Sequence, residues 1–335
     1  MIHRTVATWQ TETWQEALKN VIRTPEELFS LLKLDPALIP AAHLAGRDFA
    51  LRVPREFVRR MEPGNLNDPL LRQVLPIGDE LLATPGYSHD PLDENAANPH
   101  PGLVHKYQGR VLLVVTGSCA INCRYCFRRH FPYADNRPSR VQWQQALDYI
   151  RHDSSIHEVI FSGGDPLNAP DATLAWLTDE ISQIDHITRL RVHSRLPVVL
   201  PSRVTDQCLD WLARPRFANT LVIHANHAQE LDASVERALI QLREAGVTLL
   251  NQTVLLKGVN DSVTALSQLS ERLFACGVLP YYLHLLDKVA GAAHFDVPEQ
   301  QARQLHQALL HSLSGYLVPK LVREIPGEPS KTPVI

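Results

Sequence analysis

The chain has 335 residues, of which 44% are apolar and 21% charged, and its formal net charge is -3 at pH 7. This composition is typical of a globular protein with one large core. The charges form no long runs of one sign, which argues against nucleic acid or an anionic membrane as a partner. The N-terminus lacks the apolar core of a signal peptide, and no apolar run is long enough to span a bilayer. We therefore expect a cytoplasmic protein that acts on a small molecule or contacts another protein.

Residues 1–105 differ in texture from the rest of the chain. Short helices are expected over 14–21 and 25–32, where apolar residues recur at helical spacing. The stretch 65–101 is rich in Pro, Asn, Asp and Gly and is predicted to be loop. We interpret this part of the chain as an N-terminal segment of short helices and loops.

From residue 110 onward, apolar runs typical of strands alternate with amphipathic stretches typical of helices. The first helix is expected to begin after Ser139, a favourable N-cap. Six βα units result, which predicts an α/β fold, a partial (β/α)6 barrel of the TIM type over residues 106–300, with reactive groups at the carboxyl ends of the strands. The expected strands are 111–115, 158–162, 190–194, 220–225, 248–255 and 280–286.

Residues 301–335 are expected to contain a final helix and a tail. Prolines at 319, 326, 329 and 333 make the tail unsuitable for a helix, because proline lacks the amide proton and clashes with the preceding turn. Ordinarily such a tail would be solvated and without fixed structure.

Three cysteines stand at C-x3-C-x2-C spacing directly after the first expected strand: Cys119, Cys123 and Cys126. Three thiolates can hold a [4Fe-4S] cluster and leave one iron free for another ligand. The alternatives are a structural cluster or a zinc knuckle completed by His130, although structural zinc sites usually pair two C-x2-C units and no second unit is present. The two remaining cysteines are expected to be small buried apolar residues in helices: Cys208 and Cys276.

A second motif, Ser162-Gly163-Gly164-Asp165, follows the second expected strand. Glycines allow the backbone to approach a ligand closely, although a plain β-to-α turn has the same composition. Together with the cysteine loop, the motif resembles the radical S-adenosylmethionine (SAM) superfamily. In that superfamily the open iron holds the amino acid end of SAM and delivers the electron that breaks its C5'-S bond, while the glycine-rich turn holds the SAM amino group.

Five motifs make the chain similar to the lysine 2,3-aminomutase family, and most specifically to its short members that serve β-lysylation of elongation factor P. The resemblance runs from about residue 105 to the end, with the motifs in the family's order. It implies an isomerase that converts L-lysine to β-lysine, with the R product expected. The motifs are C-F-R-R at 126–129, S-G-G-D at 162–165, S-R-L-P-V-V-L-P at 194–201, N-Q-T-V-L-L-K-G-V-N-D at 251–261 and K-T-P-V at 331–334.

The resemblance also implies a [4Fe-4S] cluster, SAM and pyridoxal 5'-phosphate (PLP) as cofactors. Both organic cofactors are needed, because no side-chain base can remove an unactivated Cβ hydrogen, whereas a carbon radical can, and PLP delocalises the unpaired electron. The implied partners are L-lysine, an electron donor, elongation factor P and its lysyl ligase.

Residue roles follow from the same resemblance. Lys331 is implied to hold PLP, and Arg128 to bind the substrate carboxylate, to which a guanidinium can donate two parallel hydrogen bonds. Asp287 and Glu324 are implied to bind the substrate ε-ammonium. The family commonly has aspartate where Glu324 stands, and the longer carboxylate arm changes its reach. The resemblance further implies SAM contacts from four residues of the glycine motif: Ser162, Gly163, Gly164 and Asp165.

Further cofactor contacts are implied at the ends of strands. His224 and Gln252 match positions that contact SAM, and Tyr107 and Arg110 match a region that lines the PLP pocket. His284 stands where the family tends to carry an aromatic residue, which is a departure near PLP. The longer members also continue past the K-T-P motif, and any assembly that depends on that extension is not predicted here.

Three other functions remain open at this point. The chain can be an aminomutase for another amino acid, of which arginine fits and glutamate does not, because two carboxylates would repel its side chain. It can be a radical SAM enzyme that uses no PLP. It can also be a non-catalytic iron-sulfur or zinc module, which would have no use for Lys331.

Overall fold

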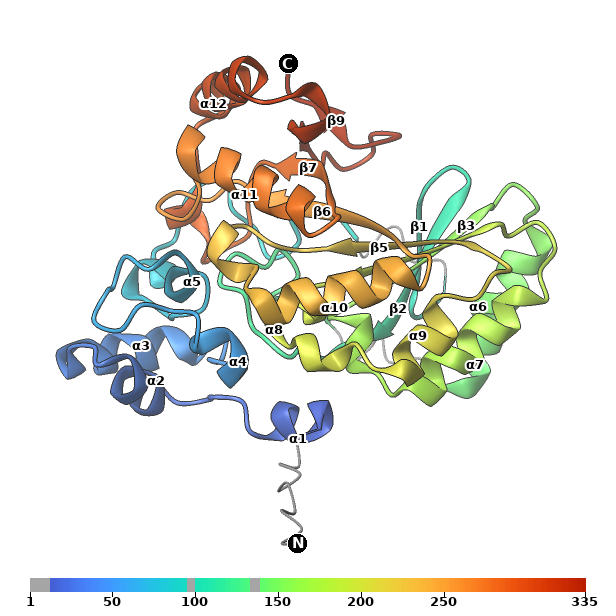
Figure 1. The fold of residues 1–335 in the computed structure, drawn as a ribbon, viewed down its shortest axis with the longest axis horizontal. Helices are drawn as coiled ribbons and strands as arrows, with labels where there is room; N and C mark the ends of the chain where they lie inside the picture. The colour runs from blue at the N-terminus through green and yellow to red at the C-terminus, as the bar shows by residue number, and fades with distance from the viewer. Residues whose placement is uncertain (1–12, 95–99, 133–138) are drawn as a thin grey trace, which may run out of the picture.

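The computed structural model describes residues 13–94, 100–132 and 139–335, whose strands form one nine-stranded sheet (Figure 1). The strands follow one another across the sheet in chain order. They run parallel from β2 through β8, and β1 and β9 are antiparallel edge strands. The strands are β1 (Leu103–Tyr107), β2 (Arg110–Thr116), β3 (Glu158–Gly163), β4 (Arg189–Ser194), β5 (Ala218–Ile223), β6 (Thr248–Val254), β7 (Leu279–His284), β8 (Lys320–Arg323) and β9 (Thr332–Pro333).

Helices connect the parallel strands and cover the outer face of the sheet, while α1 to α5 gather at one end of it (Figure 1). The helices are α1 (Trp14–Lys19), α2 (Pro25–Leu32), α3 (Ile39–Gly46), α4 (Arg55–Val58), α5 (Pro69–Arg72), α6 (Arg140–His152), α7 (Asp171–Ser182), α8 (Leu196–Val199), α9 (Asp206–Leu212), α10 (Ala233–Glu244), α11 (Val263–Ala275) and α12 (Glu299–Ser312). This is the α/β arrangement of a partial TIM-type barrel, so the predicted fold class is confirmed.

The six predicted strands correspond to β2 through β7, and β8 adds a further parallel strand that the sequence did not indicate. The proline content of the tail excluded a helix but not extended structure. Pro319 directly precedes β8, and Pro333 lies in the edge strand β9, where a missing amide proton is tolerated. The expectation of a tail without fixed structure is therefore wrong for 320–323 and 332–333, which extend the sheet.

Local signals agree with the helices. Ser139 caps α6 and accepts a hydrogen bond from the amide of Gln142, and α6 buries Trp143 and Leu147 on one face. The predicted helices at 14–21 and 25–32 match α1 and α2. Within the predicted loop 65–101, α5 and the short 3-10 helix η2 (Gly78–Leu81) are helical, and residues 95–99 lie outside the described part.

One apolar cluster runs from the N-terminal helices into the sheet and its outer helices, and includes Trp14, Phe57, Phe161 and Trp211. Cys208 and Cys276 are both fully buried, as expected. The division of the chain at residues 105 and 300 stays a prediction. Among the described residues, no helix has both the length and the apolar character to cross a bilayer.

Candidate active site

The cysteine loop leaves the carboxyl end of β2 and is held against the N-terminal segment. The amide of Asn122 donates to the carbonyl oxygen of Arg52 at 2.9 Å, and its side chain donates to that of Ala50 at 2.9 Å. Burial, together with the charge of neighbouring thiols, raises the pKa of Cys119 and raises that of Cys126 to about 12. These thiols therefore ionise when a metal centre supplies positive charge.

The donor set fits a [4Fe-4S] cluster better than a single zinc ion. Among the described residues, no three His, Cys, Asp or Glu side chains converge closely enough to hold one metal ion. Each of three thiolates can bind a separate iron of a cluster, whereas a structural zinc ion needs four ligands, so the three thiols of the loop suit the cluster. His130, the fourth ligand of the zinc alternative, instead stacks on His89 with ring centroids 4.2 Å apart.

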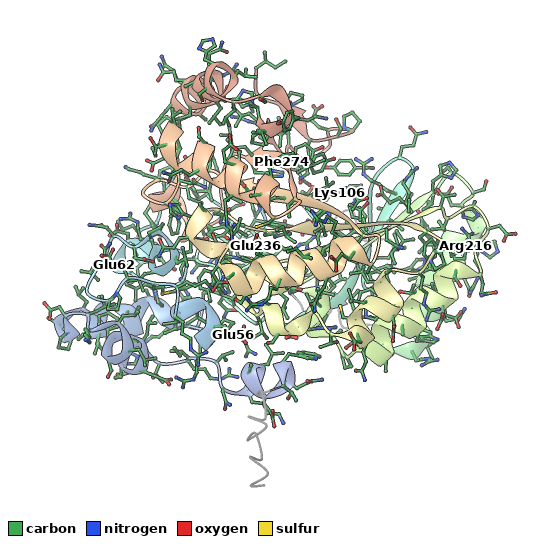
Figure 2. All side chains as sticks on the ribbon, viewed as in Figure 1. Glu56, Glu62, Lys106, Arg216, Glu236 and Phe274 are labelled. Atoms are coloured by element: carbon green, nitrogen blue, oxygen red, sulfur yellow. The ribbon has the colours of Figure 1, made fainter. Side chains whose placement is uncertain are left out.

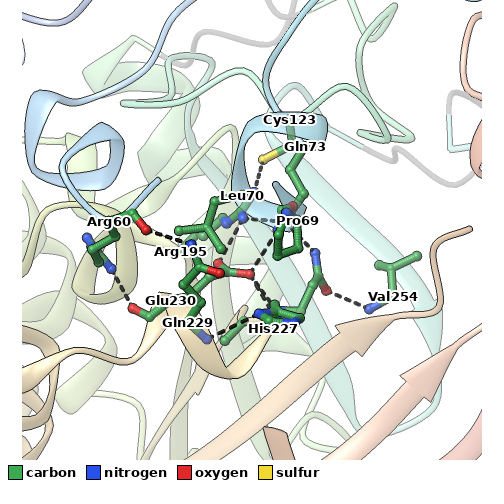
Figure 3. A network of polar contacts seen from close by, with 12 residues as sticks. Arg60, Pro69, Leu70, Gln73, Cys123, Arg195, His227, Gln229, Glu230 and Val254 are labelled. Carbon is green, nitrogen blue, oxygen red and sulfur yellow. Dashed lines mark hydrogen bonds and ion pairs between the residues drawn. The ribbon is translucent and has the colours of Figure 1, made fainter. Parts of the chain in front are cut away.

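A buried arginine that the sequence did not single out lies beside the cysteine loop (Figure 3). Arg195 follows β4 and donates from Nη1 to the Cys123 sulfur at 2.6 Å. Its Nη2 donates to Glu230 at 2.9 Å and to Gln73 at 2.6 Å. Burial opposes the charge of Arg195, but Cys123, Tyr125 and Glu230 outweigh it and raise the pKa of the guanidinium. A permanent cation therefore stands where a Cys123 thiolate needs one.

A second ion network fixes the residues that follow the cysteines. Glu80 of η2 accepts from Arg124 Nε at 2.8 Å and from Arg129 Nη2 at 2.9 Å, and all three side chains are nearly inaccessible to solvent. Arg124 also donates to the carbonyl oxygen of Phe49 at 2.6 Å. The N-terminal segment thus holds the cysteine loop from two sides.

The glycine motif after β3 packs against the start of the cysteine loop. A Cβ on Gly164 would lie 2.7 Å from the carbonyl oxygen of Ser118, and one on Gly163, whose φ is +123°, would lie 2.5 Å from that of Thr116. Only glycine permits this approach. Asp165 accepts from the Ser194 hydroxyl at 2.7 Å, which ties the turn to β4. The glycines therefore have a packing reason in addition to the predicted SAM contact.

A second cluster of charged side chains forms around Arg128. Its Nε and Nη2 donate to the two oxygens of Glu94 at 2.6 and 2.8 Å. Its Nη1 donates to the Ser162 hydroxyl at 3.2 Å and to the Gly163 carbonyl oxygen at 3.1 Å. Arg128 and Glu94 are both buried. The predicted carboxylate-binding arginine is thus placed beside the glycine motif, with a carboxylate of this chain on its fork.

The tail brings its two predicted residues to the same cluster. Lys331 Nζ donates to Glu324 at 2.9 Å, and Lys106 of β1 forms ion pairs with Glu324 at 3.6 Å and with Glu94 at 3.7 Å. Asp287 follows β7 on this side. Burial and the charge of Glu324 raise the pKa of Asp287 to about 7, although Lys331 opposes the shift. Arg128, Asp287, Glu324 and Lys331 therefore share one electrostatic environment.

Three histidines line the interior of the barrel, and their Nε2 atoms are shielded from solvent without a hydrogen-bond partner among the described residues: His193, His224 and His284. His284 is buried as a whole, and the other two are partly exposed. Burial lowers the pKa of each, that of His224 to about 4, so all three are neutral. Lys331 contributes to each shift, which places the histidines near the tail. Buried polar atoms without partners are rare in folded proteins, so this interior fits a polar ligand such as a cofactor.

The other predicted pocket residues are less tightly grouped. The Arg110 guanidinium lies 4.5 Å from the ring centroid of Tyr107, at the turn between β1 and β2. Burial raises the pKa of Tyr107, and interaction with Glu324 raises it further. This interaction connects the turn to the tail. Gln252 is a half-buried residue of β6, paired in the sheet with Tyr282, whose ring is 5.8 Å from Lys331 Nζ.

Comparison with known proteins places the chain in a family. Residues 113–266 match the Radical SAM superfamily. L-lysine 2,3-aminomutases from Escherichia coli and Haemophilus influenzae are 53% and 50% identical to it, over 98% and 96% of this chain and 96% of each relative. The L-lysine 2,3-aminomutase of Clostridium subterminale is 35% identical over 98% of this chain and 79% of that protein.

The chain belongs to the lysine 2,3-aminomutase family. Membership makes it a radical SAM enzyme of the isomerase class and implies a [4Fe-4S] cluster, SAM and PLP as its cofactors. The three loop thiols fit the cluster, and the interior near Lys331, lined by histidine nitrogens that have no partner in the described part of the chain, fits a polar cofactor.

Sequence reasoning missed four residues of the site in this lysine 2,3-aminomutase family member: Glu94, Lys106, His193 and Arg195. Arg195 had a signal, because it stands in the S-R-L-P motif directly after an expected strand. His193 is the penultimate residue of β4 and could have been found by its place at a strand end. The other two lie in a loop and in an edge strand, where nothing in the local sequence indicates a buried role.

Proposed function

We propose that this protein is an L-lysine 2,3-aminomutase that uses SAM, a [4Fe-4S] cluster and PLP to convert L-lysine to β-lysine, the R product being expected. The observation that carries the proposal is the arrangement of charge around Lys331. One buried guanidinium, Arg128, suits an α-carboxylate, and two acids, Asp287 and Glu324, suit an ammonium. Lysine has both groups, at opposite ends of one flexible chain.

Each residue has a distinct part in this reaction. Cys119, Cys123 and Cys126 would hold the cluster, and Lys331 would hold PLP. The bound cofactors supply the radical that removes a hydrogen from Cβ and an electron-delocalising carrier for the migrating amino group. Glu324 accepts a hydrogen bond from Lys331 Nζ at 2.9 Å, and this contact orients the Lys331 side chain. Burial of the site keeps water away from reactive species.

Motif resemblance to the short family members supports a role in the modification of elongation factor P, together with its lysyl ligase. It also implies an electron donor and a cytoplasmic location. The second candidate substrate is arginine, because a guanidinium can also donate to two carboxylates.

The proposal is tested with anaerobic, reconstituted protein, SAM and a chemical reductant. L-Lysine is expected to give β-lysine, detected by proton NMR, and L-arginine to give no β-arginine. The visible spectrum of the same sample should contain absorbance from both the cluster and bound PLP. Turnover of arginine in preference to lysine, or full activity without PLP, would refute the proposed reaction.

Asp287→Asn is expected to lower kcat/KM for lysine about ten- to hundred-fold, the cost of one charge-assisted contact. Because burial and Glu324 raise the pKa of Asp287 to about 7, an ammonium must compete with a proton below that pH. Lysine affinity in the parent should therefore rise between about pH 6 and about pH 8, and this rise should be absent in the variant. Equal pH profiles for parent and variant would place Asp287 outside the substrate site.

Glu324→Asp restores the residue that the family commonly carries and shortens the arm by about 1.5 Å. The side chain now reaches Lys331 at 2.9 Å and Lys106 at 3.6 Å, and a shorter arm lengthens both contacts. Lysine turnover is expected to persist with a changed rate or a changed R to S product ratio, measured by chiral chromatography. If both are unaltered, Glu324 does not contact the substrate.

A further inference from the structure

The two charged groups proposed to receive the ends of lysine already have partners from this chain. We propose that Glu94 occupies the Arg128 guanidinium in place of the substrate carboxylate, and that it moves to Lys106 when the substrate binds. This inference rests on the proposed function, since it requires Arg128 to bind a carboxylate. It assigns Glu94 and Lys106 as positioning residues that set how much the substrate carboxylate contributes to affinity.

Glu94 makes the kind of contact that a substrate carboxylate would make. Both of its oxygens accept from Arg128, at 2.6 and 2.8 Å, in the bidentate geometry that guanidinium groups use for carboxylates. The other terminal nitrogen of Arg128, Nη1, donates to Ser162 and Gly163, and those bonds fix the guanidinium plane. A substrate carboxylate that approaches the Nε and Nη2 side of the fork must therefore displace Glu94.

Lys106 lies where a displaced Glu94 can pair again. Its Nζ is 3.7 Å from Glu94 and 3.6 Å from Glu324, and it donates to the carbonyl oxygen of Leu92 at 3.0 Å. Lys106 belongs to β1, and Glu324 follows β8, so this ammonium joins the first strand to the tail.

The exchange conserves charge pairs. When the substrate ammonium takes Glu324, Lys106 loses one of its two carboxylate partners, and when the substrate carboxylate takes Arg128, Glu94 loses its bidentate partner and keeps only Lys106. Glu94 and Lys106 are of opposite charge and already adjacent, so they can neutralise one another. Without that acceptor, Glu94 would be left as an unpaired charge in a buried site, which is strongly unfavourable.

Competition from Glu94 should lower the affinity of the protein for lysine. In the parent protein the substrate carboxylate gains only the difference between its own contact with Arg128 and that of Glu94. Glu94→Gln removes the competing charge, so the carboxylate of lysine should contribute more. A ligand without a carboxylate, 1,5-diaminopentane, should be indifferent to the change.

The test is isothermal titration of PLP-loaded protein without SAM, so that no turnover occurs, with L-lysine and with 1,5-diaminopentane. Glu94→Gln is expected to raise lysine affinity about ten-fold, the size of one charge-assisted contact, and to change that for 1,5-diaminopentane less than about two-fold. Glu94→Asp, which keeps the charge but shortens the arm, should give a smaller gain of the same sign. The control is Glu236→Gln, which breaks a 2.9 Å ion pair with Arg272 on the outer helices (Figure 2) and should change neither affinity.

Lys106→Met provides the second measurement. It should weaken lysine binding in the parent, where displaced Glu94 then has no partner, and have a smaller effect in the Glu94→Gln background. An equal effect in both backgrounds would overturn the exchange. So would weaker or unchanged lysine binding by Glu94→Gln in protein that retains its PLP and its circular dichroism spectrum, because Glu94 would then be a fixed support of Arg128.

Failure of the proposed function gives a different result. If Arg128→Met in the Glu94→Gln background leaves the preference for lysine over 1,5-diaminopentane unchanged, Arg128 does not bind the carboxylate at all. If that preference is lost, Arg128 is the carboxylate site, and the two Glu94 variants alone decide whether the exchange occurs.

Discussion

Alanine at any one of Cys119, Cys123 and Cys126 is expected to remove most of the bound iron and all aminomutase activity, whereas alanine at Cys208 or Cys276 should leave both. The three loop thiols are half-buried at the carboxyl end of β2, and the other two are fully buried in the apolar core. A [4Fe-4S] cluster with two thiolates loses the charge and geometry that hold it. Iron and sulfide content of anaerobically purified variants measures the effect.

The Cys208 and Cys276 variants are the matched controls, because each removes one sulfur atom, as the loop variants do, but from the apolar core. They should lower thermal stability slightly through lost packing, without changing iron content. Iron loss on changing either of them, or tightly bound zinc in place of iron, would contradict a cluster held by the loop alone.

Arg195 lies where it can modify a cluster bound at Cys123 without being one of its ligands. Its guanidinium donates to the Cys123 sulfur and is itself held by buried Glu230 and Gln73 (Figure 3). A thiolate ligand that accepts a charge-assisted hydrogen bond donates less electron density to iron, and hydrogen bonds to the sulfurs are among the factors that set cluster potential. We therefore expect the arginine of the S-R-L-P motif to influence the reduction potential of a cluster bound at Cys123.

The parallel core of the fold could be predicted because each strand carries its own signal. Runs such as 111–115 are apolar at every position, since both faces of the sheet are covered, and β2 follows that run closely. The tail carried no such signal. Residues 320–323 form a strand by pairing with the edge of β7. Because α12 separates the two strands in the chain, local composition does not reveal this pairing.

The same limit applies to the site. Motif spacing and resemblance identified Arg128 and Glu324, and the structure brings them into one charged cluster. Arg128 pairs with Glu94, which lies 34 residues earlier in the chain. Glu324 pairs with Lys106, which lies on the edge strand β1. Long-range ion pairs of this kind depend on how the tail closes against β1, which no local pattern encodes. The sequence therefore indicated candidate groups for the site and left open which side chains hold them in place.

Lys331→Ala is expected to abolish covalent PLP binding and all lysine turnover, while iron content stays at the parent level. Lys331 follows the β8 strand, contacts Glu324 and lies near the ring of Tyr282. Its charge lowers the pKa of three histidines whose Nε2 atoms have no partner among the described residues, so this interior offers polar atoms to a cofactor. A lysine amine is the group to which PLP attaches between turnovers. Borohydride reduction of the holoprotein followed by peptide mapping should locate the pyridoxyl label on Lys331.

The controls are Lys257→Ala and Lys288→Ala, both at exposed lysines on the same half of the barrel. They should retain PLP absorbance and turnover. A label on either of these lysines, or undiminished PLP absorbance in Lys331→Ala, would show that the tail serves only to complete the sheet. Loss of PLP with iron retained would separate the two cofactor sites, because the loop proposed to hold the cluster contacts the N-terminal segment, which the tail variant leaves untouched.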